Sequence, residues 1–280
     1  MDRGGRVYSQ GEGQPIPGGR VILVGLVSGG MDSATAFADA INKFNPDVKV
    51  ALTVVYGQRH ARELKAAAEV AKFYGAQHLV VDLSDLFEKV KEVSALLGGR
   101  GVPEAEELVP GLVPPTYVPQ RNAVLLASAG AILEKLMIER NDGLGVISVG
   151  FHGTDYAPGE PVYPDTRPEF VEAMERALNE GSSVVFNFKR AGREAKITIY
   201  APFVRLKKKD VVKRALELGV PLELTWTCYR GGDRPCGTCP ACVSRLRAFM
   251  EAGVPDPLTE SYERLPEWYV RWLRSVRKGR

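Results

Sequence analysis

The stretch VILVGLVSGGMDSATAF, residues 21–37, decides the fold. An apolar run typical of a buried strand turns through Gly29 and Gly30 into small residues typical of a helix. At such a turn, unpaired backbone N–H groups and the positive end of the helix dipole face outward. Both features favour an anion, and a phosphate group fits them best. A tight connection between strand and helix, without a ligand, is the alternative for the turn alone.

The side chains of this turn indicate a nucleotide with a metal ion. Ser28 and Ser33 offer hydroxyl groups, while the carboxylate of Asp32 would repel a bare phosphate and therefore suggests magnesium. The turn lacks the lysine of G-x-x-x-x-G-K-[ST] and the glycine spacing of G-x-G-x-x-G. It resembles instead the pyrophosphate loop of the ATP pyrophosphatases, which split ATP into AMP and pyrophosphate. The residues assigned to ATP and magnesium are Ser28, Gly29, Gly30, Met31, Asp32, Ser33 and Ala34, with Asp32 and Ser33 as catalytic candidates.

Composition is ordinary for a globular protein of 280 residues, with 45% hydrophobic and 25% charged residues. No apolar run approaches the roughly 20 residues that a membrane span needs. Residues 1–20 are polar and glycine-rich without an apolar core, so we expect a flexible extension and a cytoplasmic protein. A net charge of +3 is too small to indicate nucleic-acid binding, and we expect the basic cluster 207–209 to be solvated surface.

All four cysteines lie in TWTCYRGGDRPCGTCPAC, with the spacing C-x7-C-x2-C-x2-C. Tight turns at Gly237 and Pro240 can point the sulfurs at one centre, which predicts a structural zinc site without an open ligand position. An iron–sulfur cluster and two disulfides remain the alternatives, the disulfides being disfavoured in the cytosol. The predicted metal ligands are Cys228, Cys236, Cys239 and Cys242.

Strands and helices alternate along the chain, as a doubly wound parallel α/β sheet requires. The expected strands are 21–27, 49–56, 77–82 and 145–150, and the expected helices are 32–43, 60–74, 123–139 and an amphipathic helix ending at Gly219. Residues 184–199 alternate in hydrophobicity and predict a β-hairpin, while residues 84–116 predict a mobile excursion, a candidate lid. We expect an α/β domain over 21–222, with a zinc-binding and helical region over 223–280 packed on it.

Polar residues follow several strand ends, where open α/β sheets bind their ligands. Two begin the helix after the second strand, two stand at the entrance of the helix at 123–139, and the rest lie in the loop 152–170. So many polar and aromatic residues are unusual in a loop built for packing alone. The residues assigned to substrate are Arg59, His60, Arg121, Asn122, Asp155, Tyr163, Asp165 and Arg167, and Arg121 is also a catalytic candidate.

Together, the motifs SGGMDSAT, YGQRH, YVPQRN, GFHGTDY, YPDTRPEF and TWTCYRGGDRPCGTCPAC resemble the 7-cyano-7-deazaguanine synthases of the queuosine and archaeosine pathways. The resemblance covers residues 21–258. It implies a fold of the adenine nucleotide alpha hydrolase type. It also implies ATP-dependent conversion of 7-carboxy-7-deazaguanine and ammonia to the nitrile through adenylated intermediates. The chain departs from the family pattern at Gln120, at His152 and in a longer segment over 157–162.

Three other functions remain open. A tRNA-modifying thiolase of the same superfamily needs a free cysteine or an iron–sulfur centre, and a related enzyme could modify a peptide. A zinc-ribbon adaptor could bind nucleic acid through Arg230, Arg234, Arg245 and Arg247. We expect a small-molecule substrate, with no direct nucleic-acid partner and no membrane, and the sequence leaves open whether the chain forms a homodimer.

Overall fold

The computed structural model describes residues 7–8, 15–16, 20–57, 61–97, 113–156 and 163–278 of the chain. Its main sheet has five parallel strands in the order β5-β4-β3-β6-β7. The strands are β3 (Val21–Leu26), β4 (Val48–Val55), β5 (Gln77–Asp82), β6 (Leu144–Ser148) and β7 (Lys196–Tyr200). The order in which strands are added reverses between β3 and β6, so the switch point, where such sheets bind ligands, lies between them. The predicted α/β class is confirmed.

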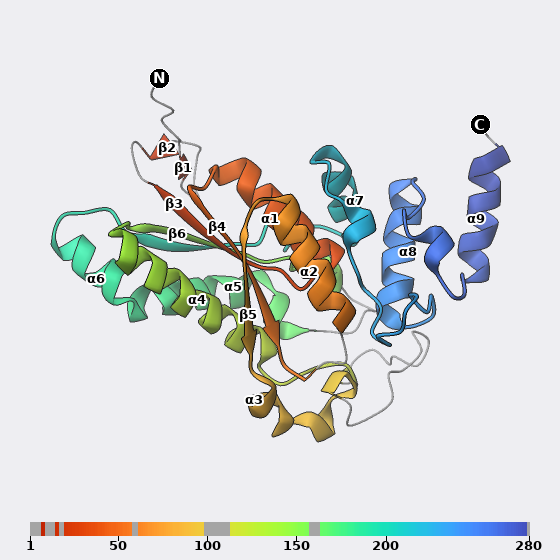
Figure 1. Ribbon diagram of the computed structural model, residues 1–280, viewed down its shortest axis with the longest axis horizontal. Helices are drawn as coiled ribbons and strands as arrows, with labels where there is room; N and C mark the ends of the chain where they lie inside the picture. Colours follow the sequence, from red (N-terminus) through yellow and green to blue (C-terminus); the bar gives the residue numbers. More distant parts are fainter. Residues whose placement is uncertain are drawn as a thin grey trace.

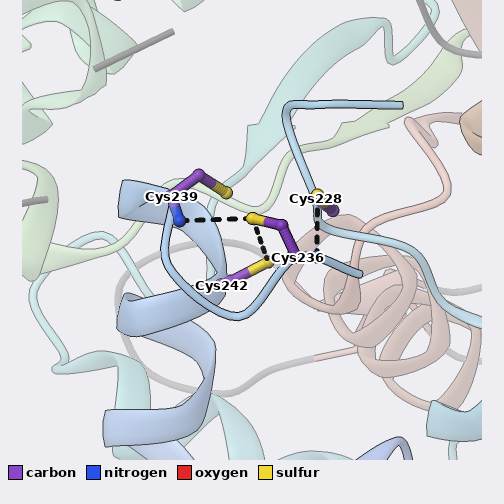
Figure 2. A group of neighbouring side chains, drawn as sticks. All are labelled: Cys228, Cys236, Cys239 and Cys242. Atoms are coloured by element: carbon purple, nitrogen blue, oxygen red, sulfur yellow. Dashed lines mark hydrogen bonds between the residues drawn. The ribbon is translucent and has the colours of Figure 1, made fainter. Parts of the chain in front are cut away.

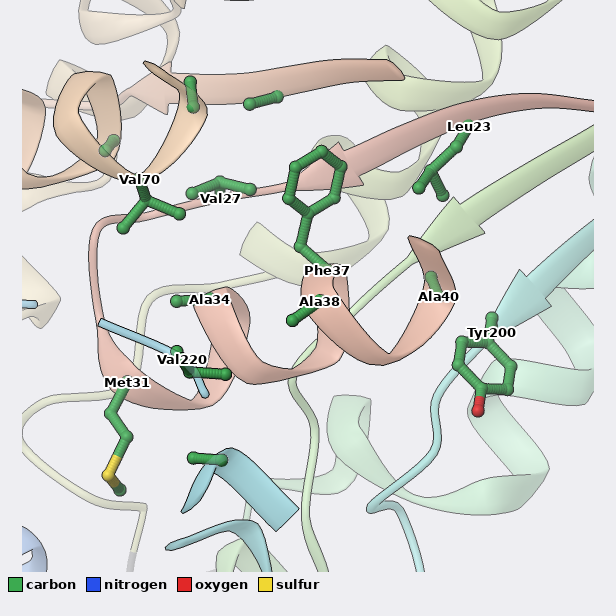
Figure 3. Packing of buried hydrophobic residues seen from close by; sticks show 14 of the residues in the cluster. Leu23, Val27, Met31, Ala34, Phe37, Ala38, Ala40, Val70, Tyr200 and Val220 are labelled. Carbon is green, nitrogen blue, oxygen red and sulfur yellow. The ribbon is translucent and has the colours of Figure 1, made fainter. Parts of the chain in front are cut away.

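Helices cover both faces of this sheet (Figure 1). One face carries α1 (Met31–Phe44) and α2 (Ala61–Phe73), and the other carries α4 (Arg121–Arg140), α5 (Pro168–Gly181) and α6 (Ser183–Arg190). Leu23 therefore packs in the core below α1, and its neighbour Ile22 packs in the core below α4. Figure 3 shows Phe37 of α1 projecting toward the sheet near Val27. Because both faces are buried, β3 is apolar throughout and not alternating.

Further helices extend the fold sideways from α1. Helix α7 (Lys208–Glu217) contacts α1 and α8 (Pro240–Ala252), and α8 contacts α9 (Glu267–Lys278) near the C-terminus (Figure 1). A short antiparallel pair, β1 (Val7–Tyr8) with β2 (Pro15–Ile16), precedes the sheet. Within the described ranges, none of the helices combines the length and the apolar character that a bilayer span requires.

The predicted hairpin over 184–199 is wrong. Its first half forms α6, and its second half forms β7, which pairs parallel to β6. The start of α6 is capped twice, since Ser182 Oγ accepts the Val185 N–H at 3.2 Å and Glu134 Oε1 accepts the Val184 N–H at 3.1 Å. These caps favour a helix over the strand that the alternating pattern suggests. A parallel β7 also requires a crossover, which α5 and α6 supply.

We expect Ser182→Ala to lower the free energy of unfolding by about 1 kcal/mol, the usual effect of losing an N-cap hydroxyl. Urea denaturation measures the change. Ser183→Ala is the matched control, because Ser183 is exposed and its substitution should cost less than about 0.5 kcal/mol. Equal losses in the two variants would contradict the capping role.

The expectation of a mobile excursion is wrong for residues 84–97. This segment forms α3 (Ser84–Glu88) and two 3₁₀ turns, Lys91–Val93 and Ala95–Leu97. Phe87, Leu96 and Leu97 are buried in a small cluster with Val118. The glycines and prolines on which the expectation rested begin at Gly98, after this segment, whose structure follows from the burial of its apolar side chains. Residues 98–112 of the predicted lid lie outside the described residues.

Candidate functional site

The pyrophosphate loop lies between β3 and α1. Gly29 has φ +85° and packs directly on α2, since a Cβ there would lie 2.4 Å from the Glu63 carbonyl oxygen. Ser33 Oγ accepts the Ser28 N–H at 3.2 Å, and Ser28 Oγ accepts the Gly30 N–H at 3.3 Å, so the two serines hold the loop closed. Gly30 is the N-cap of α1, and no side chain of the described chain caps the helix there. The open helix start is a ready anion site.

Two residues assigned to ATP from the sequence point elsewhere. The side chains of Met31 and Ala34 are fully buried in the core cluster that α1 shares with the sheet, α7 and α8. Both belong to the first turn of α1, so toward a nucleotide they can offer only their backbone groups.

Asp32 carries the negative charge of the loop. Its Oδ2 lies 3.0 Å from Lys208 Nζ and 3.7 Å from His152 Nε2. Burial acts to raise the pKa of the Asp32 carboxyl, but Lys208 and His152 outweigh it and hold that pKa well below its usual value. Oδ1 is buried and has no hydrogen-bond partner among the described residues. An ionised carboxylate with an unsatisfied oxygen suits a cation.

Three segments meet at Asp32. A Cβ on Gly150, just after β6, would lie 2.6 Å from the backbone of Ser33, so the two loops touch at the switch point. The Gly153 N–H donates to Leu206 O at 2.7 Å, and the Lys208 N–H donates to Thr154 Oγ1 at 3.1 Å. These bonds tie the start of α7 to the same place.

The expectation that the basic cluster 207–209 is solvated surface is wrong for Lys208. Its side chain is 12% exposed and is directed at Asp32. Lysine repeats are usually solvated, and the acidic partner lies on α1, distant in sequence. The sequence therefore carried no local signal for this contact.

Arg121 is the centre of a second group of polar side chains. It begins α4, and its Nη1 donates to Tyr56 Oη, just beyond β4, at 3.4 Å. Burial acts to lower the pKa of the Arg121 guanidinium, but Tyr56, Tyr229 and Asp165 outweigh it and raise that pKa. Asn122 is buried and donates to the Asp165 carbonyl oxygen at 3.2 Å, which fixes the turn that carries Asp165. The guanidinium is therefore charged and held in place.

Two more tyrosines, Tyr163 and Tyr229, belong to this group of side chains. Tyr163 Oη lies 2.6 Å from Thr116 Oγ1. Burial raises the pKa of the Tyr229 hydroxyl well above its usual value, with Tyr163 adding to the rise and Arg121 opposing it. We refer to Tyr56, Arg121, Tyr163, Asp165 and Tyr229 as the Arg121 cup. The sequence named three of its members, whereas Tyr56 and Tyr229 were quoted in motifs without being assigned to a site.

Of the other residues assigned to substrate, some lie outside the described residues and one is exposed. Arg59 and His60 lie outside the described residues, and of Asp155 only the backbone is described, in the 3₁₀ turn Gly153–Tyr156. Arg167 is exposed and donates its Nε to Pro164 O at 3.1 Å. Residues 168–170 of the expected loop form the first turn of α5, which starts at a proline as helices often do. Gln120, before α4, has φ +52°, a conformation that favours glycine.

The four cysteines form one buried cluster (Figure 2). Their sulfurs all lie within 4.8 Å of one another, and Cys236 Sγ is 3.9 Å from Cys242 Sγ. A tetrahedral zinc with Zn–S bonds of about 2.3 Å separates its sulfurs by about 3.8 Å. Backbone N–H groups of Cys236 and Cys239 also donate to sulfurs at 3.4 and 3.3 Å. All four thiols are free, so the disulfide alternative is wrong, and the donor set fits a single metal ion.

Behind this cluster lies a buried ion pair. Arg245 and Asp256 are both 0% exposed at the side chain, and two N–H groups of Arg245 donate to the two carboxylate oxygens at 2.8 and 2.9 Å. Arg234 is also committed, since it donates to the carbonyl oxygens of Ser261 and Tyr262. Arg245 cannot contact nucleic acid, so the adaptor hypothesis is wrong on that residue.

The chain is similar to known proteins over most of its length. The family model described as "Queuosine biosynthesis protein QueC" matches residues 22–253. The chain belongs to the QueC family. The match spans the pyrophosphate loop, Arg121 and all four cysteines, and it confirms the resemblance seen in the motifs.

Curated relatives cover almost the same range. The chain is 40% identical over 254 residues to the 7-cyano-7-deazaguanine synthase of Thermoplasma acidophilum, covering 90% of this chain and 97% of that one. Proteins of the same name from Methanoculleus marisnigri and Gloeothece citriformis are 41% and 39% identical. They cover 85% and 84% of this chain and 97% and 94% of their own. The QueC relatives are thus similar over nearly their whole length.

Proposed function

We propose that the chain is a 7-cyano-7-deazaguanine synthase, an ATP-dependent ligase that converts 7-carboxy-7-deazaguanine and ammonia to the nitrile. The observation that carries the proposal is the placement of two sites on one edge of the sheet. An open helix start with a charged carboxylate at Asp32 adjoins the switch point, and a charged Arg121 at the start of α4 donates to Tyr56, just beyond the neighbouring strand β4. Membership of the QueC family supports the reaction.

ATP would bind with its β- and γ-phosphates at the start of α1. The N–H groups of the loop and of the first helical turn, together with the hydroxyls of Ser28 and Ser33, would donate to the phosphates. Lys208 lies beside the loop and adds positive charge there. Such donors stabilise pyrophosphate as a leaving group, which directs the substrate oxygen to the α-phosphorus.

The cup would orient the heterocycle. Arg121 would pair with the substrate carboxylate, and Asp165 could accept hydrogen bonds from ring N–H groups. The half-buried rings of Tyr56 and Tyr163 offer flat apolar surface to a purine-like ring. Asn122 would act through Asp165 by fixing its backbone.

The proposed reaction proceeds in four steps. A carboxylate oxygen attacks the α-phosphorus of ATP and pyrophosphate leaves, giving the adenylate. Ammonia displaces AMP and gives the amide. The amide oxygen then attacks the α-phosphorus of a second ATP and pyrophosphate leaves again. Loss of that oxygen as AMP, with loss of both N–H protons of the amide, gives the nitrile. No covalent bond to the protein forms, which agrees with a chain whose four cysteines all lie in one cluster.

Two metal ions fit the residues present. Asp32, with a buried Oδ1 that lacks a hydrogen-bond partner among the described residues, would hold magnesium. That ion would neutralise charge on the phosphates. The four cysteines would hold zinc, which stabilises the fold and leaves no open ligand position.

The test is incubation of the purified protein with 7-carboxy-7-deazaguanine, ATP, magnesium and ammonium. We expect mass spectrometry to find 7-cyano-7-deazaguanine, and nucleotide analysis to find AMP. Absence of the nitrile under these conditions, with AMP no higher than in a reaction lacking the heterocycle, would overturn the proposal.

Metal content separates the proposal from a thiolase with an iron–sulfur centre. We expect about one zinc per chain and no iron in protein purified without oxygen. Cys239→Ser should lose the zinc and lower the solubility of the protein, while Thr238→Ala, the adjacent control, should keep the metal. One iron–sulfur cluster per chain in place of zinc would favour the thiolase.

A further inference from the structure

Tyr229 belongs to the Arg121 cup and directly follows Cys228 of the cysteine cluster. We propose that its ring forms a wall of the heterocycle pocket, and that the metal-binding loop positions this ring so as to set the affinity for substrate. The inference rests on the proposed function, since it concerns the same pocket. It assigns to the cysteine loop a part in substrate recognition besides its part in stability.

Packing supports a bridging position. Tyr229 packs against the buried cluster that contains the four cysteines. It also packs against the cluster of Phe87, Leu96, Leu97 and Val118, on which Tyr56 packs as well. A side chain shared by two cores transmits the position of one to the other, because packed interiors leave little room for independent movement.

The neighbours of Tyr229 define what it can recognise. Tyr56 packs on the same small cluster as Tyr229 and accepts a hydrogen bond from Arg121 Nη1 at 3.4 Å. The side chain of Tyr229 is only half-buried, so part of it stays accessible to a ligand. Aromatic rings around one charged guanidinium suit a flat heterocycle that carries a carboxylate. Bases stack favourably on aromatic side chains.

The cysteine loop constrains the backbone on both sides of this ring. The residue before it, Cys228, is a member of the cluster, and the N–H of the residue after it, Arg230, donates to Cys228 Sγ at 3.4 Å. Three residues before Tyr229, the Trp226 N–H donates to the Gly29 carbonyl oxygen at 2.8 Å. A metal on the sulfurs would therefore fix the backbone around Tyr229. The contact of this segment with the pyrophosphate loop is made by Trp226, on the other side of Cys228 from Tyr229.

Binding measurements on the zinc-loaded protein test the inference. Calorimetry follows 7-carboxy-7-deazaguanine, a fluorescent ATP analogue follows the nucleotide site, and elemental analysis follows zinc. We expect Tyr229→Ala to weaken heterocycle binding by about tenfold or more, with nucleotide affinity within about twofold and zinc retained. Tyr229→Phe, which keeps the ring, should stay close to wild type. Arg230→Ala is the matched control, because Arg230 is exposed and adjacent.

A chelator arm tests the positioning by the metal. Wild-type protein stripped of zinc, at a temperature where its circular dichroism spectrum is unchanged, should lose heterocycle affinity much as Tyr229→Ala does. Equal loss of nucleotide affinity would overturn the positioning role. Unchanged heterocycle binding in Tyr229→Ala, or loss of zinc and of both ligands in that variant, would overturn the inference alone. Failure of the wild type to bind this heterocycle would overturn the proposed function, and the inference with it.

Discussion

Asp32→Asn should reduce kcat/KM by at least about a hundredfold while the protein stays folded. The substitution keeps the shape of the side chain and removes its charge. We expect the fold to persist because the Asp32 carboxylate is not part of the apolar core. Its Oδ2 faces Lys208, and its Oδ1 has no hydrogen-bond partner in the described chain. Loss of this charge would weaken the binding of magnesium, and with it the neutralisation of charge on the phosphates. Rates measured at saturating magnesium give the effect.

Asp39→Asn is a matched control for this variant. Asp39 is also on α1 and also pairs with a basic residue of α7, with Arg214 Nη2 at 2.6 Å from Oδ1. It accepts a further bond from Tyr200 Oη at 2.6 Å, and it lies two turns beyond the loop. We expect this variant to lose stability and keep its rate. A near-normal rate in Asp32→Asn, or equal losses of rate in both variants, would contradict the role given to Asp32.

Arg245→Met should lower the free energy of unfolding by about 3–5 kcal/mol, because it leaves the Asp256 carboxylate buried without its partner. Arg245 also donates to Thr225 Oγ1 at 2.7 Å and to the Leu222 carbonyl oxygen at 3.1 Å. These bonds hold the segment before the cysteines against α8. Chemical denaturation of the zinc-loaded protein measures the loss.

Two further variants separate the charge from the packing. Arg247→Met, on the exposed side of the same helix, should change stability by less than about 0.5 kcal/mol. The double variant Arg245→Met with Asp256→Leu should recover much of the loss, since it leaves no unpaired charge in the interior. A single variant as stable as wild type would show that the buried pair contributes little.

Local patterns in the sequence predicted the sheet and the pyrophosphate loop well. An apolar strand, two glycines and a helix in direct succession depend on neighbours in the chain, so β3 and α1 begin and end within one residue of expectation. The cysteine spacing likewise predicted a cluster, because tight turns bring sulfurs together without help from the rest of the fold.

Tertiary contacts decided what the sequence could not. Glu134 of α4 reaches across to cap α6, which turned an expected strand into a helix. Lys208 meets Asp32, and Tyr229 packs on the same small cluster as Tyr56, only because α7 and the cysteine loop fold back on the sheet edge. Partners so distant in sequence leave no periodic signal. The sequence therefore indicated a solvated position for Lys208 and no binding role for Tyr229.

Transfer of heavy oxygen from the substrate carboxylate is the most direct test of adenylation at the pyrophosphate loop. A loop that holds the β- and γ-phosphates together favours pyrophosphate as the leaving group, so the carboxylate oxygen must bond to the α-phosphorus and leave with AMP. With ¹⁸O in the carboxylate of 7-carboxy-7-deazaguanine, we predict ¹⁸O in AMP and none in inorganic phosphate. Label in inorganic phosphate, with ADP as the nucleotide product, would contradict adenylation at this loop.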